Sequence, residues 1–269
     1  KSTGSEQKRV LTVTIEPQRY FLKQIVGENF TVNTLVPPGT SPETYEPAPS
    51  VMVDMANSSH YFKVGDLGFE KAWSRRLADN NPDVVIVDCS DGIELIMSQG
   101  HEHEGHYHGE MDPHVWSSPS AIKIFTMNML ESVISTDPDD EEFYRSNYSD
   151  FIARVDSTDK IIREILQDSP SRSFIIYHPA LSYFALDYDL HQYSMEFEGK
   201  SPSPSQLREL VDLARNENIN TVFIQRGFDS KNAEVIANEI GAEVFEINPL
   251  NYDWNEELIR IASIIGRKQ

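Results

Sequence analysis

The longest helical pattern in the sequence runs from about residue 138 to 169, and it limits what the rest of the chain can fold into. Asp137-Pro138-Asp139-Asp140 is a strong helix start, and Ser169-Pro170 ends the pattern. Between these points apolar residues recur at intervals of three or four positions, or of their sum, at Tyr144, Tyr148, Phe151, Val155, Ile162 and Ile165. A helix of about 28 residues would be about 40 Å long at ~1.5 Å per residue, which is enough to run the height of a two-domain molecule.

Short β-rich runs alternate with helical patterns on both sides of this segment. The predicted strands cover residues 9–15, 30–36, 61–64, 82–88, 173–177, 190–195, 220–225 and 243–247. The run 82–88 is apolar enough to predict a strand buried on both faces. Such alternation is typical of parallel sheets. We therefore expect an α/β fold of two (β/α) lobes with parallel sheets, joined by one long backbone helix. The predicted domains are 1–137, 138–169 and 170–269.

The composition narrows the classes of partner. The 269 residues include 43 acidic and 23 basic side chains, giving a formal charge of −20. This charge argues against nucleic acid, because phosphate binding needs clustered Lys and Arg, and it favours cations as partners. No apolar run reaches the ~18 residues that a membrane helix needs. The single cysteine, Cys89, follows an apolar run and is expected to be a small buried residue at a strand end.

Five of the eight histidines lie within residues 101–114. Imidazole binds divalent metals such as zinc near neutral pH, so a dense histidine tract indicates metal binding. A solvated loop with incidental metal affinity is the alternative. The tract has two parts. His101, His103, His106 and His108 stand among Glu and Gly without apolar periodicity, whereas His114 lies between Pro113 and Val115-Trp116 and is expected to belong to ordered structure.

Three candidate ligands follow predicted strands: Glu43, His114 and His178. Parallel sheets gather loops at their carboxyl edge, so two facing lobes would bring distant loops to one cleft. One carboxylate and two imidazoles suit zinc, with manganese or iron possible in a more oxygen-rich site. From the residues alone, His178 could equally cap a helix and Glu43 could be surface charge.

Five segments occur in an order that resembles a known family. They are Val36-Pro-Pro-Gly-Thr-Ser-Pro-Glu-Thr-Tyr-Glu-Pro-Ala-Pro49, Gly65-Asp-Leu-Gly-Phe-Glu70, Met111-Asp-Pro-His-Val-Trp116, Tyr177-His-Pro-Ala-Leu-Ser-Tyr-Phe184 and Ile247-Asn-Pro-Leu250. The ordered set is similar to the zinc and manganese solute-binding proteins of bacterial ABC transporters, the cluster A-I group of zinc-uptake and TroA-like lipoproteins. Each segment alone is a weak signal, but together they cover nearly the whole chain.

The resemblance implies a metal ion buried between two lobes, with His114 and His178 at positions of metal-binding histidines. It also implies a His-rich loop beside the site, export across the inner membrane and handover of the ion to a membrane permease. We accordingly expect a monomeric, periplasmic or extracytoplasmic protein that binds Zn²⁺, with Mn²⁺ or Fe²⁺ possible. The polar start Lys1 to Lys8 is typical of the tether of an exported protein, with or without a lipid anchor, and equally of a frayed terminus.

The sequence departs from the family at the remaining ligand positions. Glu43 stands where most members have His, and Asn248 stands where manganese-type members have a binding Asp. The late strand that usually precedes Glu ends in Gln225. Asn248 and Gln225 are weak zinc ligands, so the predicted site is Glu43, His114, His178 and Asn248, with Gln225, His60 or water as alternatives for the fourth ligand. Affinity should fall below about pH 6, because imidazole must be deprotonated to bind metal.

Two other classes of function remain open from sequence. A zinc-dependent hydrolase also uses two histidines and a glutamate, but the sequence has no His-Glu-x-x-His helix, nucleophile elbow or phosphate-binding Gly-rich loop. A periplasmic metal-buffering protein or an adhesin could share the fold. The tract His101 to Gly109 is expected to capture zinc, to sense its abundance, or to lie beside the site without a role in metal binding.

Overall fold

The computed structural model describes residues 9–98, 111–196, 200–226 and 231–267. It contains two four-stranded sheets, and every strand pairing in them is parallel. The chain divides into two compact units. Unit 1 consists of Lys1–Ile93 and Ile122–Arg154, and unit 2 consists of Glu94–Ala121 and Val155–Gln269. The expected α/β fold with two parallel-sheet lobes is confirmed.

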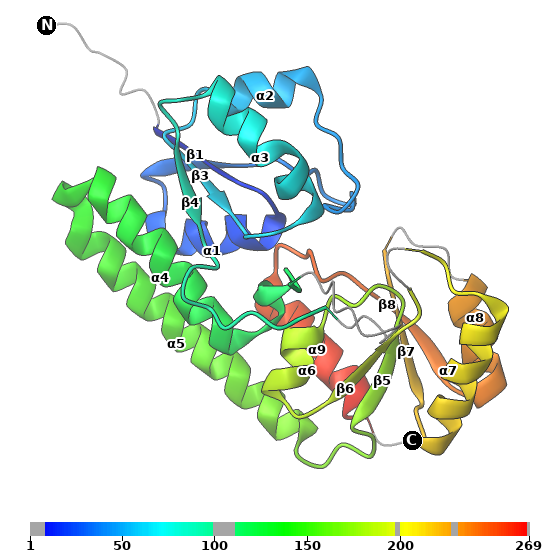
Figure 1. Ribbon diagram of the computed structural model, residues 1–269. Coiled ribbons are helices and arrows are strands. Elements are labelled where there is room, and N and C mark those ends of the chain that lie inside the picture. Colours follow the sequence, from blue (N-terminus) through cyan, green and yellow to red (C-terminus); the bar gives the residue numbers. More distant parts are fainter. Residues whose placement is uncertain (1–8, 99–110, 197–199, 227–230, 268–269) are drawn as a thin grey trace, which may run out of the picture. The chain divides into compact units, whose positions relative to one another are not determined.

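Unit 1 is built on a sheet of order β2-β1-β3-β4 (Figure 1). Its strands and helices are β1 Arg9–Val13, α1 Glu16–Val26, β2 Phe30–Thr34, α2 Pro49–Met55, β3 His60–Lys63, α3 Gly68–Asn80 and β4 Val85–Asp88. Helix α1 lies on one face of this sheet, and α2 and α3 lie on the other. Helices α1 and α3 each bury an apolar stripe, since Phe21 and Leu22 of α1 and Phe69 and Leu77 of α3 are almost fully buried.

Strand β4 differs from its prediction. The apolar run 82–88 predicted a strand buried on both faces, but β4 is the edge strand of the sheet and Val85 is 51% exposed. An apolar run by itself does not distinguish an edge strand from a central one. Cys89, just after β4, is fully buried as expected.

Two helices link the units. Helix α4 spans Pro119–Thr136, a short 3₁₀ turn covers Pro138–Asp140, and α5 spans Glu141–Leu166. The predicted backbone helix is therefore present, with 26 residues in its α-helical part. Its residues up to Arg154 belong to unit 1, and those from Val155 belong to unit 2.

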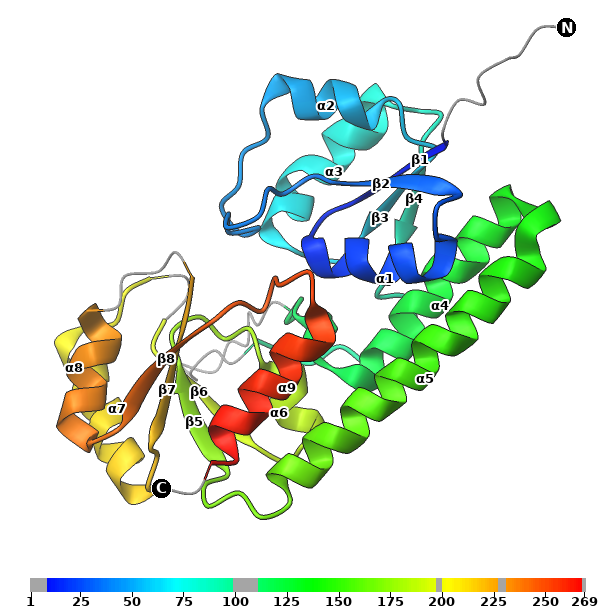
Figure 2. The ribbon, with the colours of Figure 1, turned by 180° about the vertical axis from the view of Figure 1, so that it is seen from behind.

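Unit 2 has a sheet of order β6-β5-β7-β8 (Figure 2). Its elements are η1 Val115–Ser117, β5 Ser173–Ile176, α6 Ser182–Asp187, β6 His191–Ser194, α7 Pro204–Asn216, β7 Thr221–Gln225, α8 Lys231–Ile240, β8 Glu243–Ile247 and α9 Trp254–Ile265. Helices α7 and α8 cover one face and α6 and α9 the other. Helix α7 begins with a capping box, in which Ser203 and Gln206 satisfy each other's backbone N–H groups, with Pro204 at the first helical position.

The segment 94–121, which ends in the first turn of α4, belongs to unit 2. Trp116 Nε1 donates to Pro249 O (2.9 Å), and Trp254 Nε1 donates to Trp116 O (2.6 Å). Asp187, at the end of α6, accepts hydrogen bonds from the hydroxyls of Ser118 and Ser120 at the start of α4. These contacts divide the chain differently from the domain boundaries 1–137, 138–169 and 170–269, which stay a prediction.

Among the described residues, no helix combines the length and the hydropathy needed to cross a membrane.

Candidate metal site

His178 lies at the carboxyl edge of the unit 2 sheet, two residues after the end of β5. The side chain of Gln225, at the end of neighbouring β7, holds its backbone from both sides. Gln225 Oε1 accepts from His178 N (3.2 Å), and Gln225 Nε2 donates to His178 O. The pairing of β5 with β7 brings the two residues together. Gln225, an alternative for the fourth ligand, thus has both amide atoms engaged in positioning His178.

His114 lies just before η1 and is 6% exposed. Asp112 fixes it locally, because its Oδ1 accepts from His114 N (2.8 Å) and from His114 Nδ1 (2.7 Å). Tyr183 of α6 anchors the same segment, since its hydroxyl donates to Asp112 O (2.8 Å) and accepts from Ile96 N (3.2 Å). Burial raises the pKa of Tyr183 to about 12, so this phenol stays a donor at neutral pH. Asp112 therefore holds the His114 ring, and Tyr183 holds the backbone on which Asp112 lies.

The two imidazoles converge. His114 Nε2 and His178 Nε2 are 3.2 Å apart, and the ring centroids are 5.0 Å apart. The other nitrogen of each ring faces a carboxylate: Nδ1 of His114 faces Asp112, and Nδ1 of His178 lies 2.6 Å from Glu196 Oε2. A carboxylate only accepts, so each Nδ1 carries a proton, and in the neutral form of each ring the lone pair of Nε2 points at the other ring. Two lone pairs at this distance repel unless a cation, either a proton or a metal ion, lies between them.

The spacing suits zinc. Two nitrogens bound to one tetrahedral zinc ion at ~2.0–2.1 Å would lie roughly 3.3 Å apart, close to the observed separation of the two Nε2 atoms. The carboxylate behind each ring also raises the basicity of the ligand nitrogen. Although burial alone would raise the pKa of Asp112, the charge and hydrogen bonds of His114 lower it below its usual value, so Asp112 stays ionised. The pair is thus a preorganised two-nitrogen donor within unit 2.

Asn248 also lies at the carboxyl edge of this sheet, directly after β8. Its backbone N–H donates to Glu257 Oε1 (2.7 Å), which fixes the backbone here. It lines a cavity of about 300 Å³ together with six other residues of unit 2, Arg226, Glu246, Ile247, Asn251, Glu257 and Arg260. A role for Asn248 as a ligand stays a prediction.

Glu43 belongs to unit 1, in the loop that follows β2. Its Oε2 accepts from Gly68 N (3.1 Å), at the start of α3, and among the described residues its Oε1 has no hydrogen-bond partner. The backbone of the loop is held as well, because Phe69 N donates to Pro42 O (2.8 Å). One carboxylate oxygen is therefore committed to the protein, and the other is available to a ligand.

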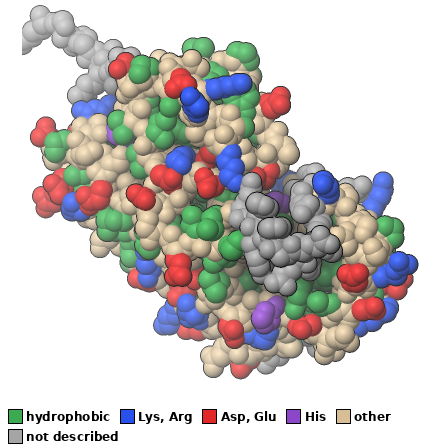
Figure 3. Space-filling model, in the orientation of Figure 1, with side chains coloured by type: hydrophobic (Ala, Val, Ile, Leu, Met, Phe, Trp, Pro, Cys, Tyr) green, Lys and Arg blue, Asp and Glu red, His purple; other side chains and the backbone are tan. Residues whose placement is uncertain are grey.

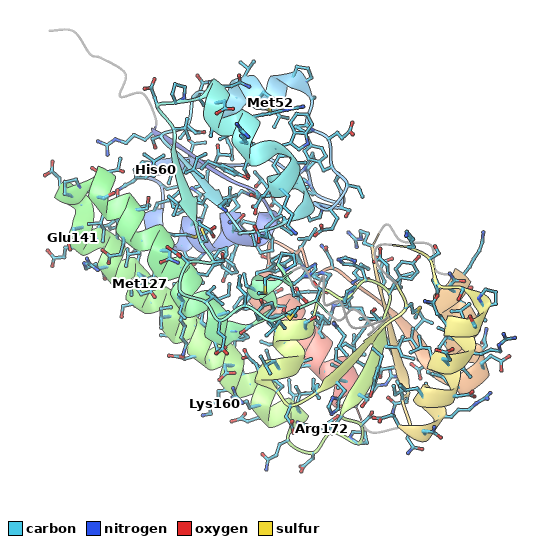
Figure 4. All side chains as sticks on the ribbon, in the orientation of Figure 1. Met52, His60, Met127, Glu141, Lys160 and Arg172 are labelled. Atoms are coloured by element: carbon cyan, nitrogen blue, oxygen red, sulfur yellow. The ribbon has the colours of Figure 1, made fainter. Side chains whose placement is uncertain are left out.

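His60, another alternative for the fourth ligand, lies at the amino end of β3 (Figure 4). The loop of Glu43 follows the carboxyl end of β2, at the opposite edge of the same parallel sheet. Both ring nitrogens of His60 face hydroxyls, Nδ1 that of Ser59 (3.1 Å) and Nε2 that of Thr136 (3.0 Å). Within unit 1, His60 therefore fastens the sheet to α4, and the structure does not bring it to Glu43; its role as an alternative ligand stays a prediction.

The auxiliary histidines His101, His103, His106 and His108 lie outside the described residues. Their flanking residues are described: Met97 and Met111 form an isolated antiparallel bridge, and Asp112 N donates to Ile96 O (2.8 Å). The two ends of the His-rich segment thus meet next to Asp112, the partner of His114.

Sequence reasoning did not identify the two carboxylates that orient the histidines. Asp112 had a local signal, because it lies two residues before His114 in Met111-Asp-Pro-His. Glu196 had none, since it lies 18 positions after His178 and reaches it only because β6 pairs with β5. The formal charge of −20 is not gathered at one place, since Figure 3 shows acidic side chains spread over the visible face of both units.

The sequence and the fold are both similar to those of known zinc-binding proteins. The sequence matches the family described as ZnuA, the periplasmic component A of the zinc-uptake complex, over residues 11–258. The high-affinity zinc uptake system protein ZnuA of Bacillus subtilis is 30% identical over 257 residues, which cover 92% of this chain and 80% of that protein.

Two further comparisons agree with this match. The zinc-binding lipoprotein AdcA of Streptococcus pneumoniae is 29% identical over 257 residues, covering 91% of this chain but 51% of AdcA, so the chain spans about half of that protein. The crystal structure of a ZnuA deletion mutant with zinc bound superposes with a TM-score of 0.89 at 35% identity, covering 97% of each chain.

Proposed function

Because the chain belongs to the ZnuA family of periplasmic zinc-uptake components, we propose that it binds one zinc ion outside the cytoplasm and delivers it to the membrane permease of an ABC transporter. Zinc is here the cargo, and manganese is the second candidate ion. The chain acts as a monomer and catalyses no reaction. An extracytoplasmic location accords with a periplasmic family and with the lipoprotein AdcA among its relatives.

The observation that carries this proposal is the imidazole pair of unit 2. His114 and His178 supply two Nε2 atoms 3.2 Å apart, each ring oriented by a carboxylate. We assign both as zinc ligands. Glu43 supplies a carboxylate oxygen as the third donor, which lowers the net charge of the bound zinc. Asn248 or a water molecule completes the set.

Zinc titration against a competing chelator tests the assignment. The protein used for the titration carries His101→Ala, His103→Ala, His106→Ala and His108→Ala, so that weakly bound zinc ions do not obscure binding at the tight site. We expect one tight zinc equivalent, and we expect His114→Ala or His178→Ala in this background to lose it. Wild-type affinity in both variants would show that the ion binds elsewhere.

The His-rich segment is assigned an auxiliary role, because its ends meet beside Asp112. It captures zinc weakly and passes it to the tight site. Replacing its four histidines should remove weak equivalents and slow zinc uptake by the protein at low zinc, while the tight equivalent remains. Loss of the tight equivalent would mean that the segment supplies a ligand of the main site.

A further inference from the structure

Glu43 and the start of helix α3 form a contact that the metal-binding role alone does not explain. The first N–H groups of a helix lack partners inside the helix, and the residue before α3, Leu67, cannot cap them with its side chain. Glu43 and Pro42 satisfy two of these groups from a distant loop: Gly68 N donates to Glu43 Oε2 (3.1 Å) and Phe69 N donates to Pro42 O (2.8 Å). Glu43 is therefore an N-terminal cap supplied by a distant segment.

The lack of a side chain at Gly68 permits this approach. A Cβ atom at Gly68 would lie 2.6 Å from Glu43 O and 2.7 Å from Glu43 Oε2. Both distances are too short for real contacts, and the first involves backbone that cannot rotate away. Any other residue at this position would push the Glu43 loop off the helix.

A buried carboxylate ties the start of helix α3 to the sheet of unit 1. Glu70, in the first turn of α3, accepts from Val64 N (2.6 Å), Gly65 N (2.8 Å) and Thr14 Oγ1 (2.5 Å). The end of β3 and the end of β1 are thereby tied to the helix. The position of Gly68, and with it that of Glu43, is set by the sheet of unit 1.

We propose that Gly68 is a positioning residue that limits Glu43 to binding metal through one oxygen, and that this limit favours zinc over manganese. The inference rests on the proposed function, in which Glu43 is a ligand. Oε2 is directed at the N–H group and at the positive end of the α3 dipole, where a negative charge is stabilised. Only Oε1 is without a partner among the described residues.

The coordination number links this contact to selectivity. Zinc is satisfied by four ligands in tetrahedral geometry, whereas manganese favours six, mostly oxygen. A carboxylate that binds through both oxygens would raise the coordination number and favour manganese. A carboxylate restricted to one oxygen does not supply this additional donor, so the coordination number stays low and zinc is favoured.

Gly68→Ala tests the inference. Zinc and manganese affinities are measured separately by competition, in the background lacking the four auxiliary histidines. We expect zinc affinity to fall about tenfold or more, as for loss of other groups that orient a ligand. Manganese affinity falls less or rises, so the ratio of zinc to manganese affinity decreases. The cobalt complex should lose the intense visible absorption of a tetrahedral site.

Ala72→Gly is the matched control, because it makes the reverse exchange at an exposed position of the same helix. It should lower Tm without changing the affinity ratio. Equal losses of zinc and manganese affinity in Gly68→Ala, or no change in either, would overturn the inference. If Gly68→Ala does not fold, Glu43→Asp replaces it, because the shorter side chain cannot keep both partners and should lower the ratio in the same way.

Glu43→Ala separates this inference from the proposed function. If Glu43→Ala keeps wild-type zinc affinity while His114→Ala and His178→Ala lose it, the positioning role fails and the two-histidine site stands. If the histidine variants keep zinc as well, the proposed function itself fails.

Discussion

The two units build the same sheet but use it differently. The orders β2-β1-β3-β4 and β6-β5-β7-β8 correspond strand by strand, and a glutamate follows the same edge strand in each: Glu43 after β2 and Glu196 after β6. Glu196 faces Nδ1 of His178, whereas Glu43 caps helix α3 through Gly68. One topological position thus orients a nitrogen ligand in unit 2 and keeps its own oxygen available in unit 1.

The difference shows how donors of unequal strength are distributed. Unit 2 holds two imidazoles whose tautomers are fixed before any metal arrives, so little ordering is required on binding. In the proposed site, unit 1 contributes a single charged oxygen. We expect unit 2 to determine most of the affinity, and unit 1 to adjust charge and selectivity.

The largest effect should come from removing the nitrogen donors. His178→Ala and His114→Ala each leave one imidazole, and zinc affinity should fall by more than the ~100-fold that loss of an outer partner can cost. Glu43→Ala should cost less than either. Competitive zinc titration compares the three, and a greater loss for Glu43→Ala would reverse the proposed ranking of the units.

The next effect concerns the carboxylates behind the rings. Glu196→Gln and Asp112→Ala should each reduce zinc affinity by ~10–100-fold, because the tautomer and orientation of the ring are no longer fixed. Glu246→Gln is the control, since it removes a charge in the same unit from a carboxylate that pairs with Arg226. Equal losses in all three variants would mean that only overall charge matters.

A smaller effect on stability is expected from Glu70, the buried anchor of unit 1. Burial raises the pKa of Glu70 from 4.5 to about 6, despite hydrogen bonds that favour the charged form. The folded state thus holds this proton more tightly than the unfolded state does, and the stabilisation is complete below pH 4.5 and lost as the pH rises through 6. At ~1.4 kcal/mol per pKa unit, the loss is about 2 kcal/mol.

Denaturant unfolding at pH 4 to 7 measures this effect as the difference between the wild type and Glu70→Gln, in which the other titrating groups cancel. The free energy of unfolding of the wild type should decrease relative to that of the variant across this range. If the free energy of unfolding of the wild type minus that of Glu70→Gln stayed constant or increased with pH, the raised pKa of Glu70 would be contradicted.

The smallest effect on metal binding should come from His60. His60→Gln removes an imidazole whose two nitrogens face Ser59 and Thr136, so stability should fall by about 1 kcal/mol for the lost hydrogen bonds. Burial lowers the pKa of His60, so any stabilisation from its neutral form is present above pH 6.5 and lost as the pH falls through the folded pKa. Zinc affinity measured at pH 7 should be unchanged, and a clear decrease would indicate that His60 is a zinc ligand.

Much of the fold followed from local pattern. Alternation of β-rich runs with helical spacing located the eight strands of the described ranges and the long linking helix, because burial imposes those periods on the sequence. Edge placement did not follow, as β4 shows, because it depends on strand order. The histidine pair could be nominated by residue type and by resemblance, whereas the roles of Glu196, Gln225 and Gly68 arise only when paired strands and a docked loop bring distant residues together.

X-ray absorption at the zinc edge tests the central claim most directly. The sample is the protein with one zinc equivalent and without the four auxiliary histidines. We predict two imidazole nitrogens, with oxygen donors in the remaining positions. A spectrum with no imidazole, or with three or more, would contradict the pairing of His114 with His178 as the nitrogen donors of the site.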